Sequence, residues 1–398
     1  MSVYLDHAAT TPIIREAAEA MTAQLTRVGN ASSLHASGRD ARRVVEESRE
    51  TIAGALGCRP GEVVFTSGGT ESDNLAIKGL FWARRAEDPR RVRILSSSIE
   101  HHAVLDPLHW LADEGAKVEL VDVDAQGRLD VAAFRAALET DPASVALVTV
   151  MWANNEVGTV QPVAEVVELA HAHGIPVHTD AVQALGQLPV SFEQSGVDAM
   201  TVTGHKIGGP YGVGALVVRR ELQPTALLHG GGQERDIRSG TIDPPAIAGF
   251  ARACAVAVER QPALAERLVA LRDALVAGVR REVPDAVYNG DPDSALDHRL
   301  PGNAHLAFPG CEGDSLLMLL DARGIECSTG SACDAGVPQP SHVLLAMGAP
   351  EEMARASLRF SLGHTSTGAD VETLVEAIAP VVERARNAAL TTRPAGGA

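Results

Sequence analysis

The chain has 398 residues, which is enough to bury a sizeable core and to form more than one structural unit. Its 45% hydrophobic and 21% charged residues are ordinary for a globular protein and argue against disorder. The formal charge of -17 repels a phosphate backbone, so non-specific binding to DNA or RNA is disfavoured.

The N-terminus, MSVYLDHAATT, has no basic stretch followed by an apolar core, so we expect no signal or transit peptide. No apolar run reaches the roughly 20 residues that a membrane-spanning helix needs, so we expect a cytoplasmic protein. The five cysteines show no CxxC pair and no regular spacing, and reduced thiols are therefore expected. A zinc site built from Cys327, Cys333 and a histidine is a poor candidate at this spacing, and no metal is expected.

From about residue 60 to 220, short apolar runs alternate with helical patterns, which is typical of a mostly parallel sheet covered by helices. Apolar residues recur at helical spacing over residues 72–86 and 163–174. The pattern predicts an α/β fold. The runs predicted as strands are EVVFTS, VRILSSS, KVELVDV, SVALVTVM, IPVHTD, DAMTVT and GALVVRR.

A glycine-rich, charged stretch at 229–245 interrupts this alternation, and long helical stretches follow it at 245–261 and 264–283. A second unit is expected to begin near residue 260. It would hold the strand-like runs NAHLAF and SLRFSL, the helix DSLLMLLDARG, the loop ECSTGSACDAG and a last helix from about residue 369 to 390.

Polar side chains follow three of the predicted strands at their carboxyl ends, which is where ligands bind in open α/β sheets. One strand runs into Asn155, another ends at Asp180 with Gln183 one turn further on, and a third leads into His205 and Lys206. We therefore expect these groups to converge on one crevice.

The run FTSGGTESDNLAIKG predicts a strand, a glycine turn and a helix start, so backbone N–H groups near Gly69 and Thr70 would form an anion cradle. Lys206, in GHKIGG, would be an ordinary surface residue if it stood alone. A lysine that binds an aldehyde cofactor needs an acid to keep a ring nitrogen protonated and a site for a phosphate. Asp180 and the glycine turn supply both.

Several of these side chains also have a structural interpretation. Asp180 could cap the following helix, which is the commoner role for an Asp between a strand and a helix. His101 could be structural, or its ring could stack on a planar cofactor and shuttle protons. Cys327 is expected to fill space, whereas Cys333, in GSACDAG, is expected to be accessible on a mobile segment.

Arg359 lies in the strand-like run SLRFSL, where a buried arginine would need a partner, so a carboxylate partner is plausible and a surface position is the alternative. The glycines of GGGQERDIRSGT make that segment a candidate functional loop.

With these residues in place, the chain resembles the cysteine desulfurase family, which are fold-type I pyridoxal 5'-phosphate (PLP) enzymes of the class V aminotransferase group. The resemblance covers nearly the whole chain. It rests on YLDHAATT, GNASSLH, FTSGGTESDNLAIKG, EHHAVLD, MWANNEVG, HTDAVQ, TGHKIGGP, GGGQERDIRSGT, CSTGSAC and RFSLGHTS, which occur in the family's order with similar spacing.

The resemblance implies a large PLP-binding domain over 13–258, with a mostly parallel seven-stranded sheet between helices. It implies a smaller α+β domain, made of 1–12 and 259–398, which carries a mobile catalytic cysteine loop at about 326–340. It also implies a homodimer.

For the cofactor, the resemblance implies that Lys206 binds PLP covalently, Asp180 pairs with the pyridine nitrogen and His101 stacks on the ring. Asn155 and Gln183 would contact the ring hydroxyl. The implied phosphate ligands are Gly69, Thr70, Thr203, His205 and, from the neighbouring subunit, Thr241.

For the reaction, the resemblance implies that L-cysteine is converted to L-alanine while Cys333 takes up the sulfur as a persulfide. The catalytic residues would be Lys206, Cys333 and His101, and the substrate-binding residues Asn30, Asn155 and Arg359. The implied sulfur acceptors are an iron–sulfur scaffold protein and, as a second candidate, a tRNA-thiolation enzyme, with no direct nucleic-acid or membrane partner.

Three alternatives share parts of this site: a relative that acts on selenocysteine, an aminotransferase of the same fold, and a non-catalytic scaffold that binds PLP. Cys333 separates desulfuration from transamination, because transamination needs no cysteine.

Overall fold

A computed structural model of the chain describes residues 2–329 and 339–392. Its largest sheet has seven strands in the order β2-β8-β7-β6-β5-β3-β4. All neighbouring strands are parallel except β8, which is antiparallel to both β2 and β7, so the predicted mostly parallel α/β sheet is confirmed. The strands are β2 (Val63–Thr66), β3 (Arg93–Ser97), β4 (Lys117–Val121), β5 (Val145–Thr149), β6 (Val177–Asp180), β7 (Ala199–Thr203) and β8 (Gly214–Val218).

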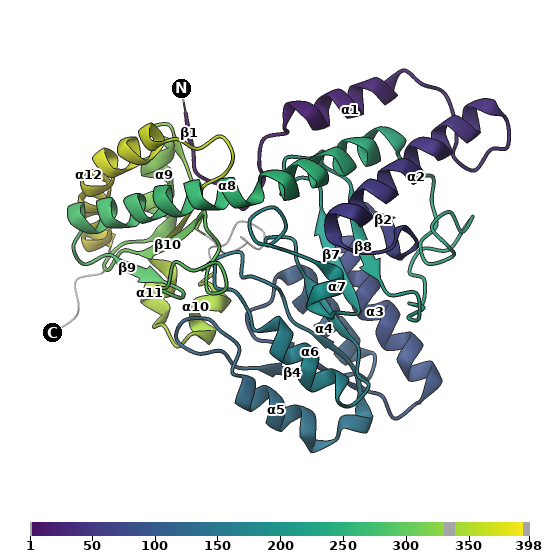
Figure 1. Ribbon diagram of the computed structural model, residues 1–398. Coiled ribbons are helices and arrows are strands. Elements are labelled where there is room, and N and C mark those ends of the chain that lie inside the picture. Colours follow the sequence, from purple (N-terminus) through teal and green to yellow (C-terminus); the bar gives the residue numbers. More distant parts are fainter. Residues whose placement is uncertain (1, 330–338, 393–398) are drawn as a thin grey trace.

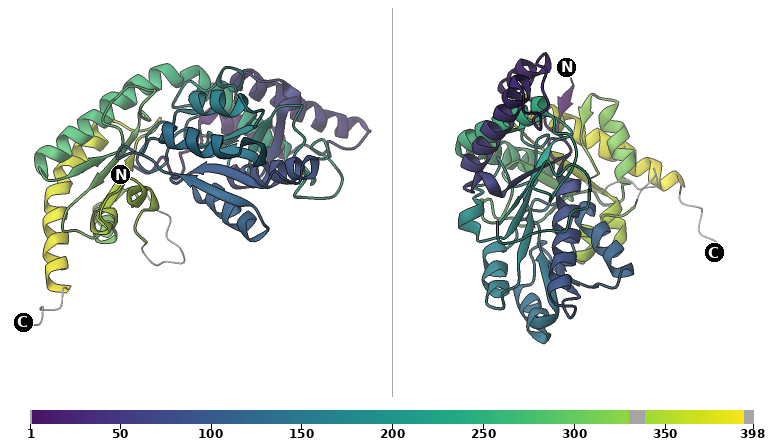
Figure 2. Two further views of the ribbon diagram at one scale, coloured as in Figure 1. Left: turned by 90° about the horizontal axis from the view of Figure 1, so that it is seen from below. Right: turned by 90° about the vertical axis from the view of Figure 1, so that its right-hand side faces the viewer.

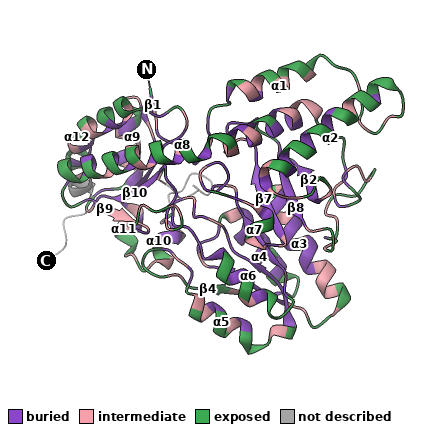
Figure 3. Ribbon diagram, viewed as in Figure 1, coloured by how far each residue is buried: buried purple, intermediate pink, exposed green. Residues whose placement is uncertain are grey.

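Burial explains why these strands appear in the sequence as short continuous apolar runs. Every residue of β5 and β7 is buried, because helices cover both faces of the sheet at its centre (Figure 3). The edge strand β4 instead contains exposed residues, among them Lys117.

Two layers of helices enclose the sheet (Figure 1). Side chains of α3 and α4 form the core on one face, whereas those of α2, α5, α6 and the first part of the long helix α8 form the core on the other. No helix in the described ranges is long and apolar enough to cross a membrane. The helices up to residue 195 are α1 (Arg15–Leu25), α2 (Ala36–Leu56), α3 (Gly69–Glu87), α4 (His102–Asp113), α5 (Val131–Thr140), α6 (Val163–His171) and α7 (Phe192–Ser195), with 3-10 turns at Pro60–Glu62 and Pro142–Ser144.

The C-terminal part of the chain builds a second, smaller unit around a three-stranded antiparallel sheet of order β12-β10-β9. The N-terminus joins this unit, because β1 (Val3–Tyr4) pairs in parallel with β11 (Ile325–Glu326). The remaining elements are β9 (Val287–Asn289), β10 (Asn303–Ala307), α9 (Gly313–Asp321), α10 (His342–Ala346), α11 (Glu351–Arg355), β12 (Ser357–Ser361) and α12 (Gly368–Thr392).

Helix α8 (Pro244–Glu282) runs across both units (Figure 2). Its start is capped by Asp243, whose carboxylate accepts a hydrogen bond from the Ala246 N–H at 3.1 Å. Residues up to Val256 belong to the core of the large unit, whereas those from Leu268 onward belong to the core of the small unit. The two helical stretches of the sequence therefore form one helix, which continues through Pro262, and the proposed domain boundary after residue 258 falls inside it.

Candidate active site

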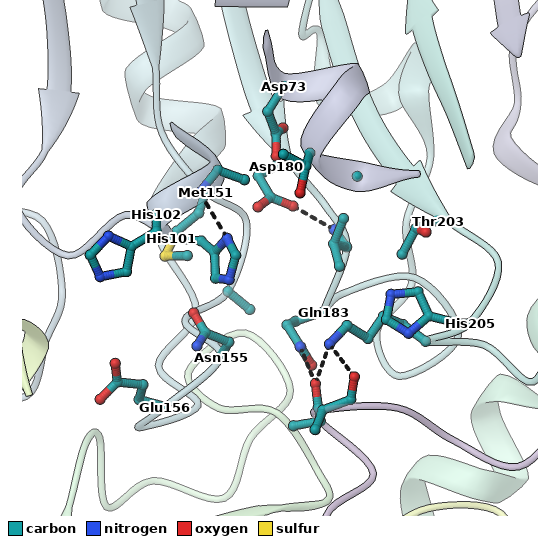
Figure 4. A pocket seen from close by; sticks show the side chains of 18 of the residues that line it. Asp73, His101, His102, Met151, Asn155, Glu156, Asp180, Gln183, Thr203 and His205 are labelled. Carbon is teal, nitrogen blue, oxygen red and sulfur yellow. Dashed lines mark hydrogen bonds between the residues drawn. The ribbon is translucent and has the colours of Figure 1, made fainter. Parts of the chain in front are cut away.

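A cavity of about 350 Å³ lies at the carboxyl ends of the central parallel strands (Figure 4). This volume is in the range of small-molecule sites. Its walls bring together residues from widely separated parts of the sequence, as the strand-end pattern led us to expect. The predicted site residues that line it are Gly69, Thr70, His101, Asn155, Asp180, Gln183, Thr203, His205, Lys206 and Arg359.

Lys206 follows β7 and presents its amine to two main-chain oxygens. The Nζ atom donates hydrogen bonds to the carbonyls of Ala8 at 2.5 Å and Ala9 at 2.7 Å. Burial, with help from the nearby charge of Arg359, lowers the pKa of Lys206 from 10.5 to about 8, although Asp6 and Asp180 act in the opposite direction. An amine of this kind is partly deprotonated near neutral pH, as a nucleophile or base requires.

Asp180 ends β6 and is 7% exposed. Its Oδ1 accepts a hydrogen bond from the Val182 N–H at 2.8 Å, so the side chain does hold the following turn while its carboxylate faces the cavity (Figure 4). Burial raises the pKa of Asp180, and the Val182 N–H and the charge of Lys206 lower it. The segment after Asp180 forms a turn and not the helix that the capping interpretation assumed, and the hydrogen bond to this turn leaves the carboxylate at the cavity.

His101 precedes α4 and caps it. Its Nδ1 accepts a hydrogen bond from the Ala103 N–H at 3.0 Å, so the neutral ring carries its proton on Nε2. Burial, followed by the charge of Lys206, lowers the pKa of His101 to about 4. The ring is thus neutral at physiological pH, and it lines the cavity as a flat, polarisable wall.

The glycine turn before α3 has the geometry of an anion cradle. Gly68 has a φ of 149°, which favours glycine, and within the described ranges no side chain caps the helix. The first N–H groups of α3 are therefore available to a ligand. The turn packs against Gly214, where an added Cβ would lie 2.7 Å from the Val202 oxygen and 2.8 Å from the Gly68 Cα. Sequence inspection had missed this role of Gly214.

Arg359 lies in β12 and is 4% exposed. Its Nη2 is 2.9 Å from Oδ1 of Asp6, and Nη1 donates to the Asn155 oxygen at 3.0 Å. Among the described residues, Nε has no hydrogen-bond partner. Arg359 is therefore buried and has a carboxylate partner, although the sequence did not identify Asp6 as that partner.

The segment between β8 and α8 is held against the large unit by two ion pairs. Glu234 is buried and accepts from both Nη atoms of Arg49, at 2.9 and 2.8 Å, and from the Phe65 N–H at 2.9 Å. Arg238 pairs with Glu71, in the first turn of α3, at 2.8 Å. The loop is thereby connected directly to the anion cradle.

Two predicted site residues lie outside the cavity. Asn30 and Thr241 are exposed and do not line the cavity, so their roles stay predictions. Cys333 lies outside the described residues. The neighbouring Cys327 is buried and free, and burial raises the pKa of its thiol to about 12, in line with a space-filling role.

The cavity also contains groups to which no role was given from the sequence. Asp73 lines its deep end, and the main-chain oxygens of Ala8 and Ala9 hold Lys206. His102 and His342 line another wall and meet in a T-shaped contact at 5.2 Å. Asp73 lies in the run TESDN, and Ala8 and Ala9 lie in YLDHAATT. Main-chain acceptors cannot be recognised in a sequence, because every residue has one.

Comparison with known proteins agrees with this geometry. The family described as aminotransferase class-V matches residues 3–374. An IscS-like cysteine desulfurase of Mycobacterium tuberculosis is 58% identical over 388 residues, which cover 97% of this chain and 98% of the relative. Cysteine desulfurase IscS of Dictyoglomus turgidum is 42% identical and covers 96% of this chain and 95% of its own.

Solved structures show the same relationship. A NifS-like protein superposes with a TM-score of 0.88 at 35% identity, covering 96% of this chain and 100% of its own. A structure named SspA in complex with cysteine gives a TM-score of 0.77 at 34% identity, with 91% and 99% covered. From the matched sequences, the shared fold and the strand-end site together, we conclude that the chain belongs to the cysteine desulfurase family of the class-V aminotransferases.

Proposed function

We propose that the protein is a PLP-dependent cysteine desulfurase that converts L-cysteine to L-alanine and receives the sulfur on Cys333. The observation that carries the proposal is the meeting, in one cavity, of an amine with a lowered pKa, a buried carboxylate and an uncapped helix start. The family of the chain supports it, because the relatives are named as cysteine desulfurases.

The residues present fit PLP at three points. Lys206 would bind its aldehyde carbon, Asp180 would pair with its ring nitrogen, and the turn at Gly69 and Thr70, with Thr203 and His205, would hold its phosphate. His101 would cover one face of the ring and Gln183 would lie at its hydroxyl. When bound, the cofactor supplies an electron sink for the negative charge that develops on the substrate α-carbon.

The chain's own groups can then move the α-proton. The amine of Lys206, once released by the substrate, takes this proton and becomes an ammonium. The carbonyls of Ala8 and Ala9 lie within hydrogen-bonding distance of that nitrogen and stabilise the charged form. His101 is a poor proton acceptor, because its Nδ1 is occupied and its pKa is about 4.

The substrate carboxylate would bind at Arg359. Its Nε is buried without a hydrogen-bond partner among the described residues, and such a donor is satisfied by an incoming carboxylate oxygen. Asn155 lies next to it through its main-chain oxygen. Asn30, exposed in this chain, is the third proposed contact.

Cys333 is the proposed sulfur acceptor within the chain. Described residues on both sides of it, Ser328 and His342, line the cavity, which supports a position within reach of the substrate. In the proposed step, the Cys333 thiolate attacks the substrate sulfur, the carbon–sulfur bond breaks and its electron pair stays with the carbon fragment that becomes alanine. A cytoplasmic iron–sulfur scaffold is the proposed next acceptor, and a tRNA-thiolation enzyme is the second candidate.

A homodimer is proposed for the assembled enzyme, with Thr241 reaching the partner's phosphate site. Large apolar side chains that are open to solvent in the single chain support it. Val28 and Leu34, between α1 and α2, are 86% and 84% exposed, and Tyr211 is 71% exposed. Sedimentation of the purified protein would test this assembly.

The decisive experiment measures alanine and sulfide released from L-cysteine in the presence of dithiothreitol. We expect the wild type to release equal amounts of alanine and sulfide, and Lys206→Ala to release neither. Cys333→Ala should keep the cofactor spectrum of the wild type but form no persulfide. Turnover of cysteine to a 2-oxo acid, with full activity in Cys333→Ala, would instead identify an aminotransferase.

A further inference from the structure

A carboxyl group next to Asp180 has no part in the proposed reaction. Asp73 lies in the second turn of α3, is 1% exposed, and lines the cavity beside Asp180 (Figure 4). Burying one carboxyl group beside another is costly when both are ionised. The arrangement therefore needs an explanation in terms of protons.

The neighbours of Asp73 come from one face of the large sheet. His178 and Asp180 are two residues apart on β6 and so project from the same face. Thr149 is the partner of His178 in β5, and Thr201 is the partner of Asp180 in β7. Helix α3 packs on this face and places Asp73 over the four side chains.

Hydrogen bonds connect the polar side chains of this cluster. Burial lowers the pKa of His178 to about 3, so its ring is neutral and has one N–H. The Thr201 hydroxyl acts on Asp73 and lies 3.0 Å from His178 Nε2. On the other side of the ring, His178 Nδ1 lies 2.9 Å from the Thr149 hydroxyl.

No cation faces Asp73 within this cluster. His178 Nε2 is 3.6 Å from Asp73 Oδ1 but belongs to a neutral ring, and Oδ1 has no hydrogen-bond partner among the described residues. The charged or titratable groups that act on Asp73 are Asp180 and the buried Glu100, and both raise its pKa on top of the larger effect of burial. Lys206 acts on Asp180 instead.

We propose that Asp73 is held as a neutral acid and is a positioning residue that keeps the single negative charge of this carboxyl pair on Asp180. A neutral acid adds no negative charge beside Asp180, whereas a second carboxylate would repel it. The charge then lies on the member of the pair that faces the cavity, where the proposed cofactor nitrogen would bind. This last consequence rests on the proposed function, but the protonation of Asp73 does not.

The first test uses the protein without cofactor. Infrared spectra at neutral pH should show the carbonyl stretch of a buried, protonated carboxylic acid, and Asp73→Asn should remove that band. Glu100 is also buried with a raised pKa, so Glu100→Gln is the matched control and should remove a separate band. If Asp73→Asn has the same carboxylic-acid bands as the wild type, the inference is overturned.

The second test measures PLP affinity and the pH midpoint of the visible absorption of the bound cofactor. Asn resembles a neutral Asp, so Asp73→Asn should bind PLP within about threefold of the wild type, whereas Asp73→Leu should bind about tenfold more weakly because the polar group beside Asp180 is lost. The pH midpoint should move in Asp73→Leu alone.

Two results would refute the positioning role. Equally weakened PLP binding in Asp73→Asn and Asp73→Leu would mean that an ionised Asp73 is required. Wild-type affinity and pH midpoint in both variants would mean that Asp73 does not act on Asp180. If Asp73→Leu does not fold, Asp73→Ala takes its place. A protein that binds PLP but releases no sulfide would contradict the proposed function and leave these results interpretable.

Discussion

The amine of Lys206 offers the sharpest test of the site. Its pKa falls from 10.5 to about 8. At pH 7 this raises the deprotonated fraction from about 0.03% to about a tenth, roughly a 300-fold increase that corresponds to about 3 kcal/mol of differential stabilisation. Among the neighbouring charges, Arg359 lowers the pKa, whereas Asp6 and Asp180 raise it. Replacing Arg359 and Asp6 in turn should move the pKa in opposite directions.

The assay is the pH dependence of PLP attachment to protein freed of cofactor. The limiting rate at saturating PLP, followed by the visible absorbance in amine-free buffer, reports the deprotonated amine. The wild-type rate should rise with pH, and the midpoint of this rise should lie near pH 8. Arg359→Met should raise this midpoint and Asp6→Asn should lower it. Arg15→Met is the control, since the Arg15 side chain is exposed and does not line the cavity.

A wild-type midpoint close to 10.5, the ordinary pKa of a lysine, would refute the electrostatic account of this site. The same account would be refuted if the midpoint moved in the same direction in Arg359→Met and Asp6→Asn. A shift in Arg15→Met equal to theirs would show that net charge, and not local geometry, controls the amine.

The remaining predictions concern residues that stabilise the fold around the site and in the small unit. Glu234→Ala removes the buried carboxylate partner of Arg49 and leaves only the more exposed Glu46, and should lower the free energy of unfolding by about 3 to 5 kcal/mol in urea titrations. Gly214→Ala forces a Cβ against the Gly68 turn, and should weaken PLP binding by about tenfold in fluorescence titrations, whereas an unchanged affinity would show that the turn yields freely. Leu306→Ala opens a void in the core of the small unit and should cost about 2 to 5 kcal/mol, measured by the same urea method.

Much of the fold could be predicted from the sequence, because buried parallel strands have a simple pattern. All seven strands of the large sheet lie within the predicted runs, and polar residues such as Asp180 lie at the cavity because the carboxyl ends of parallel strands share one edge. The continuity of α8 was missed, since Pro262 normally marks a helix boundary but here lies inside a helix packed on both units.

The finer contacts of the site depend on packing that no local pattern encodes. Asp6 meets Arg359 across 353 positions of the chain. The acceptors of Lys206 are main-chain oxygens of two alanines, which have no distinctive side chain. Asp73 appears in the sequence as one polar residue of a helix start, and its proximity to Asp180 follows only from the way α3 lies on the sheet.

The route of the N-terminal segment has a consequence for biosynthesis. Residues 6–9 are synthesised long before the residues that hold them, which are Arg359 and Ser361, whose hydroxyl accepts from the Ala8 N–H at 2.9 Å. The surroundings of Lys206 are therefore completed only when translation has passed residue 361. A nascent chain that ends before residue 361 presents an ordinary lysine at this position, so the proposed attachment of PLP depends on synthesis having passed that residue.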